Sequence, residues 1–254
     1  METPIDISED AGIRYLHFGS DWVQGAMRIR KPDALVLEYT RELLAGLLLR
    51  PAPWPRRILL IGLGAGSLSR YIHRHLPEAR STVVEIAPEV HMVAHQYFRL
   101  PTEDERFEVV IADGAAFMNR SDHGPWDLIV VDGFDRHARA GALAQQPFYA
   151  ACRARLSPEG LVAVNMFGEL RGFKAQAKRF TDAFDGQTLF LPPCESGNVV
   201  ALGRGEVPVC VPFTELQARD KALKAATGLG LAPTLKRIKG SRGASLLQGD
   251  SLRF

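Results

Sequence analysis

Short apolar runs alternate with more polar segments through the middle of the chain. Between residues 56 and 167, the apolar runs predict strands at 58–61, 82–86, 107–112, 128–131 and 161–165. The segments between some of these runs predict helices at about 67–75, 88–98 and 145–156. Continuous apolar strands that alternate with helices are typical of a parallel sheet covered on both faces. The pattern therefore predicts a doubly wound α/β fold.

The chain on either side of this core has a different pattern. Short alternating stretches at 14–18 and 25–29 predict hairpin strands, and residues 38–44 predict a helix that ends before the proline cluster at 51–55. Beyond residue 167 we expect a helix at 173–184, strands at 188–191 and 199–202, a basic helix at 214–227 and a tail. The expected regions are a small N-terminal β-hairpin and helix region at 1–55, the α/β domain at 56–212, and a basic C-terminal helix and tail at 213–254.

Composition narrows the class of protein. Hydrophobic residues make up 46% of the 254 residues and charged residues 24%, as in ordinary soluble globular proteins. The longest apolar stretches are too short to cross a membrane, and the acidic start of the chain does not resemble a secretory signal. Three widely spaced cysteines argue against a disulfide framework and favour a reducing compartment. We therefore expect a cytoplasmic protein without a membrane partner.

The net charge of +2 is unevenly distributed. Residues 213–254 contain eight Lys and Arg against three Asp and Glu, so the rest of the chain has a net charge of −3. A basic tail can bind nucleic acid or another anionic partner. A solvated helix followed by a frayed terminus is the more ordinary interpretation, and it makes a nucleic-acid partner the less favoured one.

A glycine-rich loop follows the first predicted strand of the α/β domain. Gly62, Gly64 and Gly66 lie between that strand and a helix, where glycines allow a ligand close to the backbone and the helix N-terminus offers free N–H groups. Glu85 ends the next strand about 20 residues later, where a carboxylate can accept hydrogen bonds from ribose hydroxyls. Together they predict a site for an adenosyl ligand.

Acidic residues also follow the next two strands. Asp113 and Gly114 come after one strand, and Asp132 after the other, with Asp135 three residues later. Each aspartate could simply cap a helix or form a turn. Because the carboxyl ends of parallel strands meet at one edge of the sheet, we expect these side chains to form a pocket for a ribose, an exocyclic amine and a positive group.

These motifs, in this order, resemble those of the spermidine synthase (polyamine aminopropyltransferase) family. The resemblance covers roughly residues 20–205 and rests on four segments: 58–68 around the glycine loop, Val84-Glu85-Ile86-Ala87-Pro88, Ala112-Asp113-Gly114, and 126–135 with its two aspartates. It implies the fold of class I S-adenosylmethionine-dependent methyltransferases, a Rossmann-like doubly wound sheet with a small N-terminal β-piece. Residues 56–212 would then be the adenosyl-binding catalytic domain.

The resemblance also implies roles for single residues. Glu85, with Ile86 beside it, would bind the ribose, and Asp113 with Gly114 would bind the adenine. Asp132 would be the general base, and it would hold the amine acceptor together with Asp135 and Tyr39. Gln24 would lie beside the donor. The implied reaction moves an aminopropyl group from decarboxylated S-adenosylmethionine to an amine such as putrescine, without a metal, and family members commonly form dimers or larger homo-oligomers.

Departures from the family pattern cluster on the substrate side. Ala65 stands where the family has an aspartate that meets the aminopropyl group, and Thr40 stands where a His or Gln usually follows the tyrosine. Cys194 lies in a segment that usually presents a second tyrosine. Losing a carboxylate partner for an ammonium removes a charge-assisted hydrogen bond, worth about 1.5–3 kcal/mol. The donor is therefore either decarboxylated S-adenosylmethionine or S-adenosylmethionine itself.

Two alternatives to the aminopropyltransferase stay open. One is an S-adenosylmethionine-dependent methyltransferase on the same fold, and the other is a non-catalytic adenosyl- or nucleic-acid-binding protein that uses the basic tail. His91 and His95 have the i, i+4 spacing of a zinc pair, but no third ligand at a suitable spacing is apparent, so no metal is expected. Trp22, Trp54 and Trp126 are expected to be packing residues.

Overall fold

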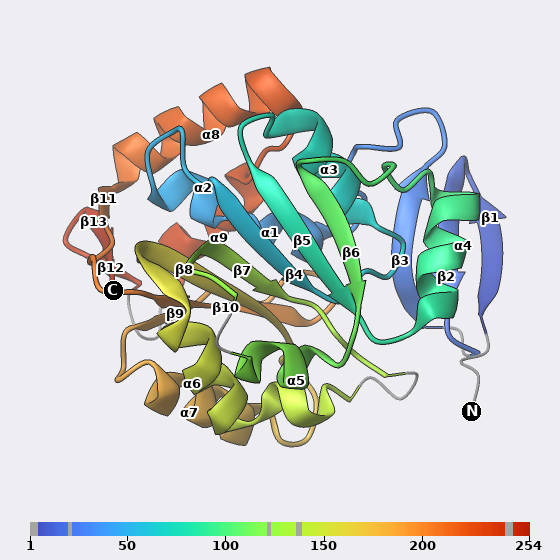
Figure 1. Ribbon diagram of the computed structural model, residues 1–254. Helices are drawn as coiled ribbons and strands as arrows, with labels where there is room; N and C mark the ends of the chain where they lie inside the picture. The colour runs from blue at the N-terminus through green and yellow to red at the C-terminus, as the bar shows by residue number, and fades with distance from the viewer. Residues whose placement is uncertain (1–4, 20–21, 121–122, 136–138, 242–245) are drawn as a thin grey trace.

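A mostly parallel sheet forms the centre of the protein in the computed structural model, which describes residues 5–19, 22–120, 123–135, 139–241 and 246–254 (Figure 1). Its strands, in spatial order, are β6 (Phe107–Ile111), β5 (Arg80–Glu85), β4 (Arg57–Ile61), β7 (Trp126–Val131), β8 (Leu156–Phe167), β10 (Asn198–Arg204) and β9 (Thr188–Phe190). The first five are parallel, and β10 runs antiparallel to both of its neighbours. The prediction of a doubly wound parallel sheet over residues 56–167 is confirmed.

Helices cover both faces of this sheet, as Figure 1 shows. In β4, Ile58 and Leu60 face one apolar cluster, whereas Leu59 and Ile61 face another, because successive side chains of a strand point to opposite faces. The first cluster packs against helices α3 (Ser67–His75), α4 (Pro88–Phe98), α8 (Phe213–Thr227) and α9 (Ala232–Gly240). The second packs against α5 (Gly114–Asn119), α6 (Gln146–Ala154) and α7 (Phe173–Ala183), and the 3-10 helix η1 (Gly141–Ala144) adds Leu143 to it.

Each α-helix in the described residues is either too short or too polar to cross a membrane. Helices α3 and α4 have the bounds that the sequence predicts. The expected helix at 38–44 is divided into α1 (Glu38–Glu42) and α2 (Gly46–Leu49). Between them, the N–H groups of Leu44 and Ala45 bond to carbonyls three residues back, which tightens the chain into turns. Helix α2 then ends two residues before Pro51, as the proline cluster requires.

A small antiparallel sheet lies at the N-terminal side and consists of β1 (Asp6–Asp10), β2 (Ile13–His17) and β3 (Val23–Arg28). Its inner face places Leu16 and Met27 in a separate apolar cluster with Ala65 of the glycine loop and Phe98 of α4. The expected N-terminal β-piece is therefore present, and it packs directly on the loop that follows β4.

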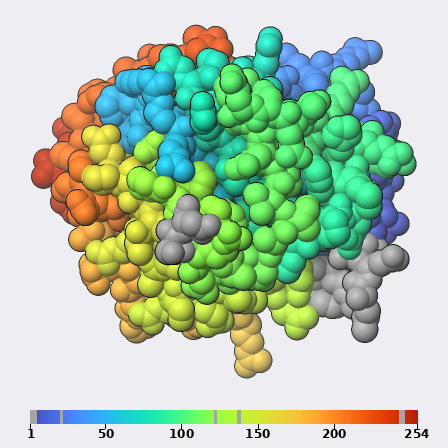
Figure 2. Space-filling view, in the orientation of Figure 1, coloured from blue at the N-terminus to red at the C-terminus, as the bar shows by residue number. Residues whose placement is uncertain are grey.

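The C-terminal segment departs from the sequence expectation. It contains the basic helix, as expected, but then a further helix, α9, and two strands, β12 (Leu247–Gln248) and β13 (Ser251–Arg253). These strands form a third sheet with β11 (Cys210–Pro212), which lies directly before the segment. Leu235, Ile238 and Leu252 of this segment are buried. In Figure 2 the segment, orange to red, lies against the body of the molecule. The expectation of a frayed terminus is wrong, because the apolar residues among its charges pack into the main core.

Candidate functional site

A cavity of ≈ 1240 Å³ opens at the carboxyl ends of the parallel strands. The strand order places the topological switch point between β4 and β7, because the chain runs from β4 outward to β5 and β6 and then returns to β7. Gly62 follows β4 and Asp132 follows β7. A Cβ at Gly62 would lie 2.3 Å from the backbone oxygen of Asp132, so only glycine allows the two strands to end this close together.

Glu85 organises the glycine loop from the end of β5. Its carboxylate accepts hydrogen bonds from the backbone N–H groups of Leu63 and Ala87, at 2.9 Å each, so it joins the glycine loop to the start of α4. Burial raises the pKa of Glu85, although the two N–H groups act in the opposite direction. Each carboxylate oxygen can accept more than one hydrogen bond. Glu85 lines the cavity and can therefore bind hydroxyl groups while it holds the loop.

Asp113 caps a short helix at the next strand end. Its Oδ1 accepts a hydrogen bond from the N–H of Ala116 at 2.8 Å, which is the ordinary work of an N-cap aspartate. Asp113 and Gly114 also line the cavity, as does the exposed Ile86. A Cβ at Gly114 would lie 2.6 Å from Ile61, so the residue type is set by the approach of α5 to β4.

Asp132 lies at the switch point and is partly buried, with Tyr39 of α1 and Asn165 of β8 as hydrogen-bond partners. The Asn165 amide donates to Asp132 Oδ1 at 2.9 Å. Burial raises the pKa of Asp132 to about 6, while the hydrogen bonds from Asn165 and Tyr39 lower it. The pKa of Tyr39 is raised well above its usual value, first by burial and then by the charge of Asp132. A carboxylate with this pKa can accept a proton near neutral pH.

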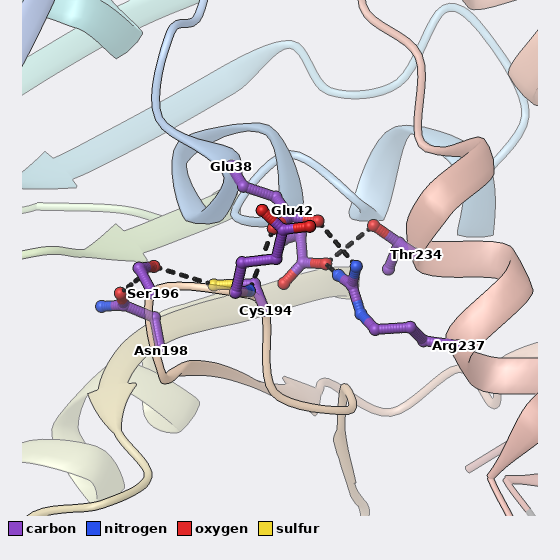
Figure 3. Close-up of polar contacts among 8 residues, drawn as sticks. Glu38, Glu42, Cys194, Ser196, Asn198, Thr234 and Arg237 are labelled. Carbon is purple, nitrogen blue, oxygen red and sulfur yellow. Dashed lines mark hydrogen bonds and ion pairs between the residues drawn. The ribbon is translucent and has the colours of Figure 1, made fainter.

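An acidic and basic cluster forms a further wall of the cavity, and Figure 3 shows its members. Glu38 of α1 receives a hydrogen bond from Arg237 of α9 at 2.6 Å and one from the N–H of Glu195 at 3.2 Å. Arg237 also pairs with Glu42, whose side chain is fully buried and accepts a second bond from Thr234 at 2.7 Å. Glu38, Glu195 and Arg237 line the cavity. Three segments far apart in the sequence therefore meet at this wall.

Aromatic side chains line the cavity beside Asp132. Trp22 is 51% exposed, and its ring meets that of Phe167 edge-on, with centroids 5.7 Å apart. Phe134 contacts the same Phe167 ring at 4.7 Å. The expectation that Trp22 is a packing residue is wrong, because this residue, directly before β3, lies in the cavity lining and leaves about half of its surface exposed. These rings offer an apolar surface to a ligand.

Asp135 lies on the loop after β7 and pairs with Arg139. The Arg139 backbone N–H and side chain both donate to its carboxylate, at 2.9 and 3.2 Å. Both residues line the cavity. A cationic ligand that binds Asp135 would therefore share this carboxylate with the Arg139 guanidinium.

Most of the residues singled out in the sequence converge on this one cavity. Its lining includes Gln24, Tyr39, Gly62, Gly64, Glu85, Ile86, Asp113, Gly114, Asp132 and Asp135. Gly66 lies outside the lining: it has a φ of +67° and starts α3. Its role is to turn the chain, since residues with side chains rarely adopt this conformation.

None of the three departures from the family pattern is among the residues that line the cavity. Ala65 is buried in the apolar cluster under the small sheet. Thr40 donates its hydroxyl to the carbonyl of Leu37 at 2.6 Å, within its own helix. Cys194 is buried, with its Sγ 3.1 Å from Ser196 Oγ. In the part of the chain that the structure describes, no three His, Cys, Asp or Glu side chains group as a metal site would need.

Several residues of the site were not singled out in the sequence. Asn165 and Asn198 are polar residues within apolar strands, and that break in the apolar pattern is a signal that could have marked them. Arg237 and Glu38 gave no such signal, because both lie on short helices where charged residues are ordinary. Their meeting depends on how α9 packs against α1.

Comparison with known proteins agrees with this arrangement. Residues 37–172 match the family model of the spermine/spermidine synthase domain. A polyamine aminopropyltransferase of Neisseria meningitidis is 38% identical over 237 residues, which cover 93% of this chain and 89% of that protein.

Two solved structures have the same fold at low sequence identity. A probable spermidine synthase from Corynebacterium glutamicum has a TM-score of 0.70 and 22% identity, covering 96% of this chain and 95% of that one. Human methyltransferase-like protein 13, in complex with SAH, has a TM-score of 0.65 and 24% identity, covering 82% of this chain and 95% of its own. The methyltransferase-like fold expected from the sequence is confirmed.

Proposed function

The chain belongs to the spermine/spermidine synthase family, and on that premise we propose that it is a polyamine aminopropyltransferase with Asp132 as its general base. It moves an aminopropyl group from decarboxylated S-adenosylmethionine to an amine such as putrescine. The observation that supports this most directly is the partly buried Asp132 at the switch point, bonded to Tyr39 and Asn165 and open to the same cavity as Glu85 and Asp113.

The chemistry of the transfer explains why a carboxylate is needed there. The acceptor is an ammonium ion at neutral pH, and its nitrogen must lose a proton before it can attack carbon. Asp132 binds the cation and then takes the proton. A nitrogen–carbon bond forms, the bond from that carbon to the sulfonium sulfur breaks, and the electron pair stays on sulfur to give methylthioadenosine. The cavity contributes by holding the two substrates in line.

The donor half of the cavity would be formed by residues at the ends of β3, β4, β5 and β6. Glu85 is proposed to bind the ribose hydroxyls with Ile86 packed beside it, and Asp113 and Gly114 to bind the adenine. Gly62 and Gly64 would allow the donor close to the backbone, with Gln24 lining the same region. The amine would lie near Asp132 and Tyr39, with Asp135 as a second carboxylate.

One observation favours a methyltransferase as the second candidate. Ala65 has no carboxylate to meet the aminopropyl ammonium, and its side chain is buried against the small sheet. The missing negative charge also removes a repulsion toward the carboxylate of undecarboxylated S-adenosylmethionine. A carboxylate at Asp132 matches the needs of amine attack, which keeps the aminopropyltransferase as the leading proposal.

Donor selection distinguishes the two candidates. The protein is incubated with putrescine and decarboxylated S-adenosylmethionine, and separately with putrescine and S-adenosylmethionine, and the adenosyl products are separated by chromatography. We expect methylthioadenosine in the first mixture only. No methylthioadenosine in that mixture, with S-adenosylhomocysteine formed in the second, would favour the methyltransferase and reject the proposal.

A further inference from the structure

A hydrogen-bond network of side chains connects Asp132 to the loop between β9 and β10. Asn165 Nδ2 donates to Asp132 Oδ1 at 2.9 Å, and Asn198 Nδ2 donates to Asn165 Oδ1 at 2.9 Å. The Ser196 hydroxyl donates to Asn198 Oδ1 at 2.6 Å. The network therefore runs from the rim of the cavity through β10 and β8 to the end of β7.

Every hydrogen bond in this network is donated in the direction of Asp132. An asparagine amide has an N–H end and a carbonyl end, so its orientation decides whether its neighbour receives or must donate a hydrogen bond. Asn198 presents N–H to the carbonyl of Asn165, and this leaves the N–H end of Asn165 for Asp132. If the Asn165 amide turned over, its carbonyl oxygen would face the carboxylate of Asp132, its N–H end would face the N–H end of Asn198, and both hydrogen bonds would be lost.

Because both asparagine side chains are buried, their amides are held in this orientation. Asn165 and Asn198 are each 3% exposed, so little water is available to replace a lost partner. Hydrogen bonds in such surroundings are stronger than in water and support one another along a chain. The same loop is tied to α1 by the N–H of Glu195, which donates to Glu38, the residue before Tyr39. The loop thus reaches Asp132 from two sides, through Asn198 and through α1.

We propose that Asn165 and Asn198 are positioning residues that keep the carboxylate of Asp132 ionised and correctly oriented, and that Asn198 acts through Asn165. The inference rests on the proposed role of Asp132 as general base. The loop between β9 and β10, at the cavity rim, then controls the protonation of Asp132 through the hydrogen bond from Ser196 to Asn198.

The other ionisable groups that face the same cavity stay constant in the test. Tyr39 of α1 contacts Asp132 directly. The remaining ionisable residues around the cavity, from α1, the strand ends, the loop after β7, the loop between β9 and β10, and α9, are Glu38, Arg41, Glu85, Asp113, Asp135, Arg139, Glu195 and Arg237.

The test replaces Asn198 by two residues of similar size. Asn198→Asp offers only acceptors to Asn165 and forces its amide to turn over, whereas Asn198→Leu removes the donor without adding charge. We expect the acidic midpoint of the kcat/KM profile to rise by about one pH unit in Asn198→Leu and by more in Asn198→Asp. At high pH, where Asp132 is ionised regardless, both variants are expected to lie within about three-fold of the parent.

A matched control separates positioning from folding. Gln176 donates its amide to Tyr149 between α6 and α7, outside the cavity lining. Gln176→Leu is expected to leave the acidic midpoint unchanged. A purely structural role for Asn198 would lower activity equally at all pH values without moving the midpoint.

A direct titration keeps the inference independent of the reaction. The carboxyl carbon of Asp132 is followed by NMR in protein with labelled aspartate and assigned by its loss in Asp132→Asn. The midpoint is expected to rise in both Asn198 variants whichever donor the enzyme uses, so this outcome does not depend on aminopropyl transfer. An unchanged carboxyl midpoint in folded Asn198→Asp would overturn the inference, and this near-isosteric variant suffices alone if Asn198→Leu does not fold.

Discussion

Asp132 is subject to opposing influences at the scale of a single residue. Loss of solvent favours its neutral form, whereas the amide of Asn165 and the hydroxyl of Tyr39 favour the charged form. Burial prevails and gives a pKa of about 6, between that of a free carboxyl and neutral pH. The group is therefore ionised in a neutral solution and still basic enough to accept a proton.

This pKa predicts the acidic limb of the activity profile. Asp132 must be unprotonated to act as a base, so kcat/KM is expected to be constant well above pH 6 and to fall about ten-fold per unit below it. Initial rates at low substrate concentration from pH 5 to 9 measure the limb. Activity that stays constant down to pH 5 would exclude Asp132 as the titrating base.

Replacing the carboxylate by an amide separates catalysis from ligand binding. Asp132→Asn is expected to lower kcat by about 10²–10⁴-fold, the usual contribution of a general base, while binding of methylthioadenosine stays close to normal. The exposed Asp182, which pairs with Lys178 on α7, provides the control variant Asp182→Asn, expected to keep full activity. Equal kcat in both variants would contradict the assigned role.

The same variant has a pH-dependent effect on folding. The pKa of Asp132 is raised in the folded state, so ionisation destabilises the protein above pH 6 and has no effect below the unfolded value of 3.8. We expect Asp132→Asn to increase the free energy of unfolding by roughly 2 kcal/mol at pH 8, less than the full shift implies because the open cavity admits water. Urea denaturation at pH 8 and pH 4 should show this gain at the higher pH only.

At the scale of elements, α9 completes the site from a distant part of the chain. Its apolar residues Leu235 and Ile238 pack into the main core, which directs Thr234 and Arg237 toward α1. There the single positive charge of Arg237 pairs with the carboxylates of both Glu38 and Glu42. Burial raises the pKa of Glu42, and without Arg237 this side chain would be an uncompensated charge inside the protein.

Removing Arg237 should therefore destabilise the fold. Arg237→Ala is expected to lower the free energy of unfolding by about 3 kcal/mol, the low end for breaking a buried ion pair, because Arg237 itself is partly exposed. Lys236→Ala changes an exposed residue on the same helix and serves as the control. Chemical denaturation of the two variants at neutral pH measures the difference, and equal midpoints would mean that Glu42 does not depend on Arg237.

At the scale of the whole molecule, the small N-terminal sheet and the glycine loop interlock. A Cβ at Gly25 of β3 would lie 2.6 Å from the Cβ of Ala65 and 2.9 Å from its backbone nitrogen. The carbonyl of Gln24 lies 3.1 Å from where a Cβ at Gly64 would be. The sheet therefore holds the loop in the shape that borders the cavity, and Ala65 is a packing residue of this contact.

Separating the two parts should affect binding as well as stability. Gly25→Ala forces β3 away from the loop, and we expect the free energy of unfolding to fall by about 1–3 kcal/mol and the affinity for methylthioadenosine to decrease. Calorimetric titration and thermal unfolding measure both effects. The control Gly240→Ala adds a methyl group with no neighbour within 4 Å and should change neither. Unaltered binding in Gly25→Ala would show that the loop holds its shape without the sheet.

Local sequence patterns predict the α/β sheet and most of the candidate site. Apolar runs of strand length are local features, and parallel strands bring their carboxyl ends to one edge of the sheet. The sequence therefore predicts that Gly62, Glu85, Asp113 and Asp132 lie together, as they do in the cavity lining. The positions of three further residues follow from the three-dimensional packing alone: Arg237 joins the site, Ala65 packs against the small sheet, and Asn198 reaches Asp132 through Asn165. These contacts join segments far apart in the chain, and their geometry depends on packing between elements, which local sequence patterns do not encode.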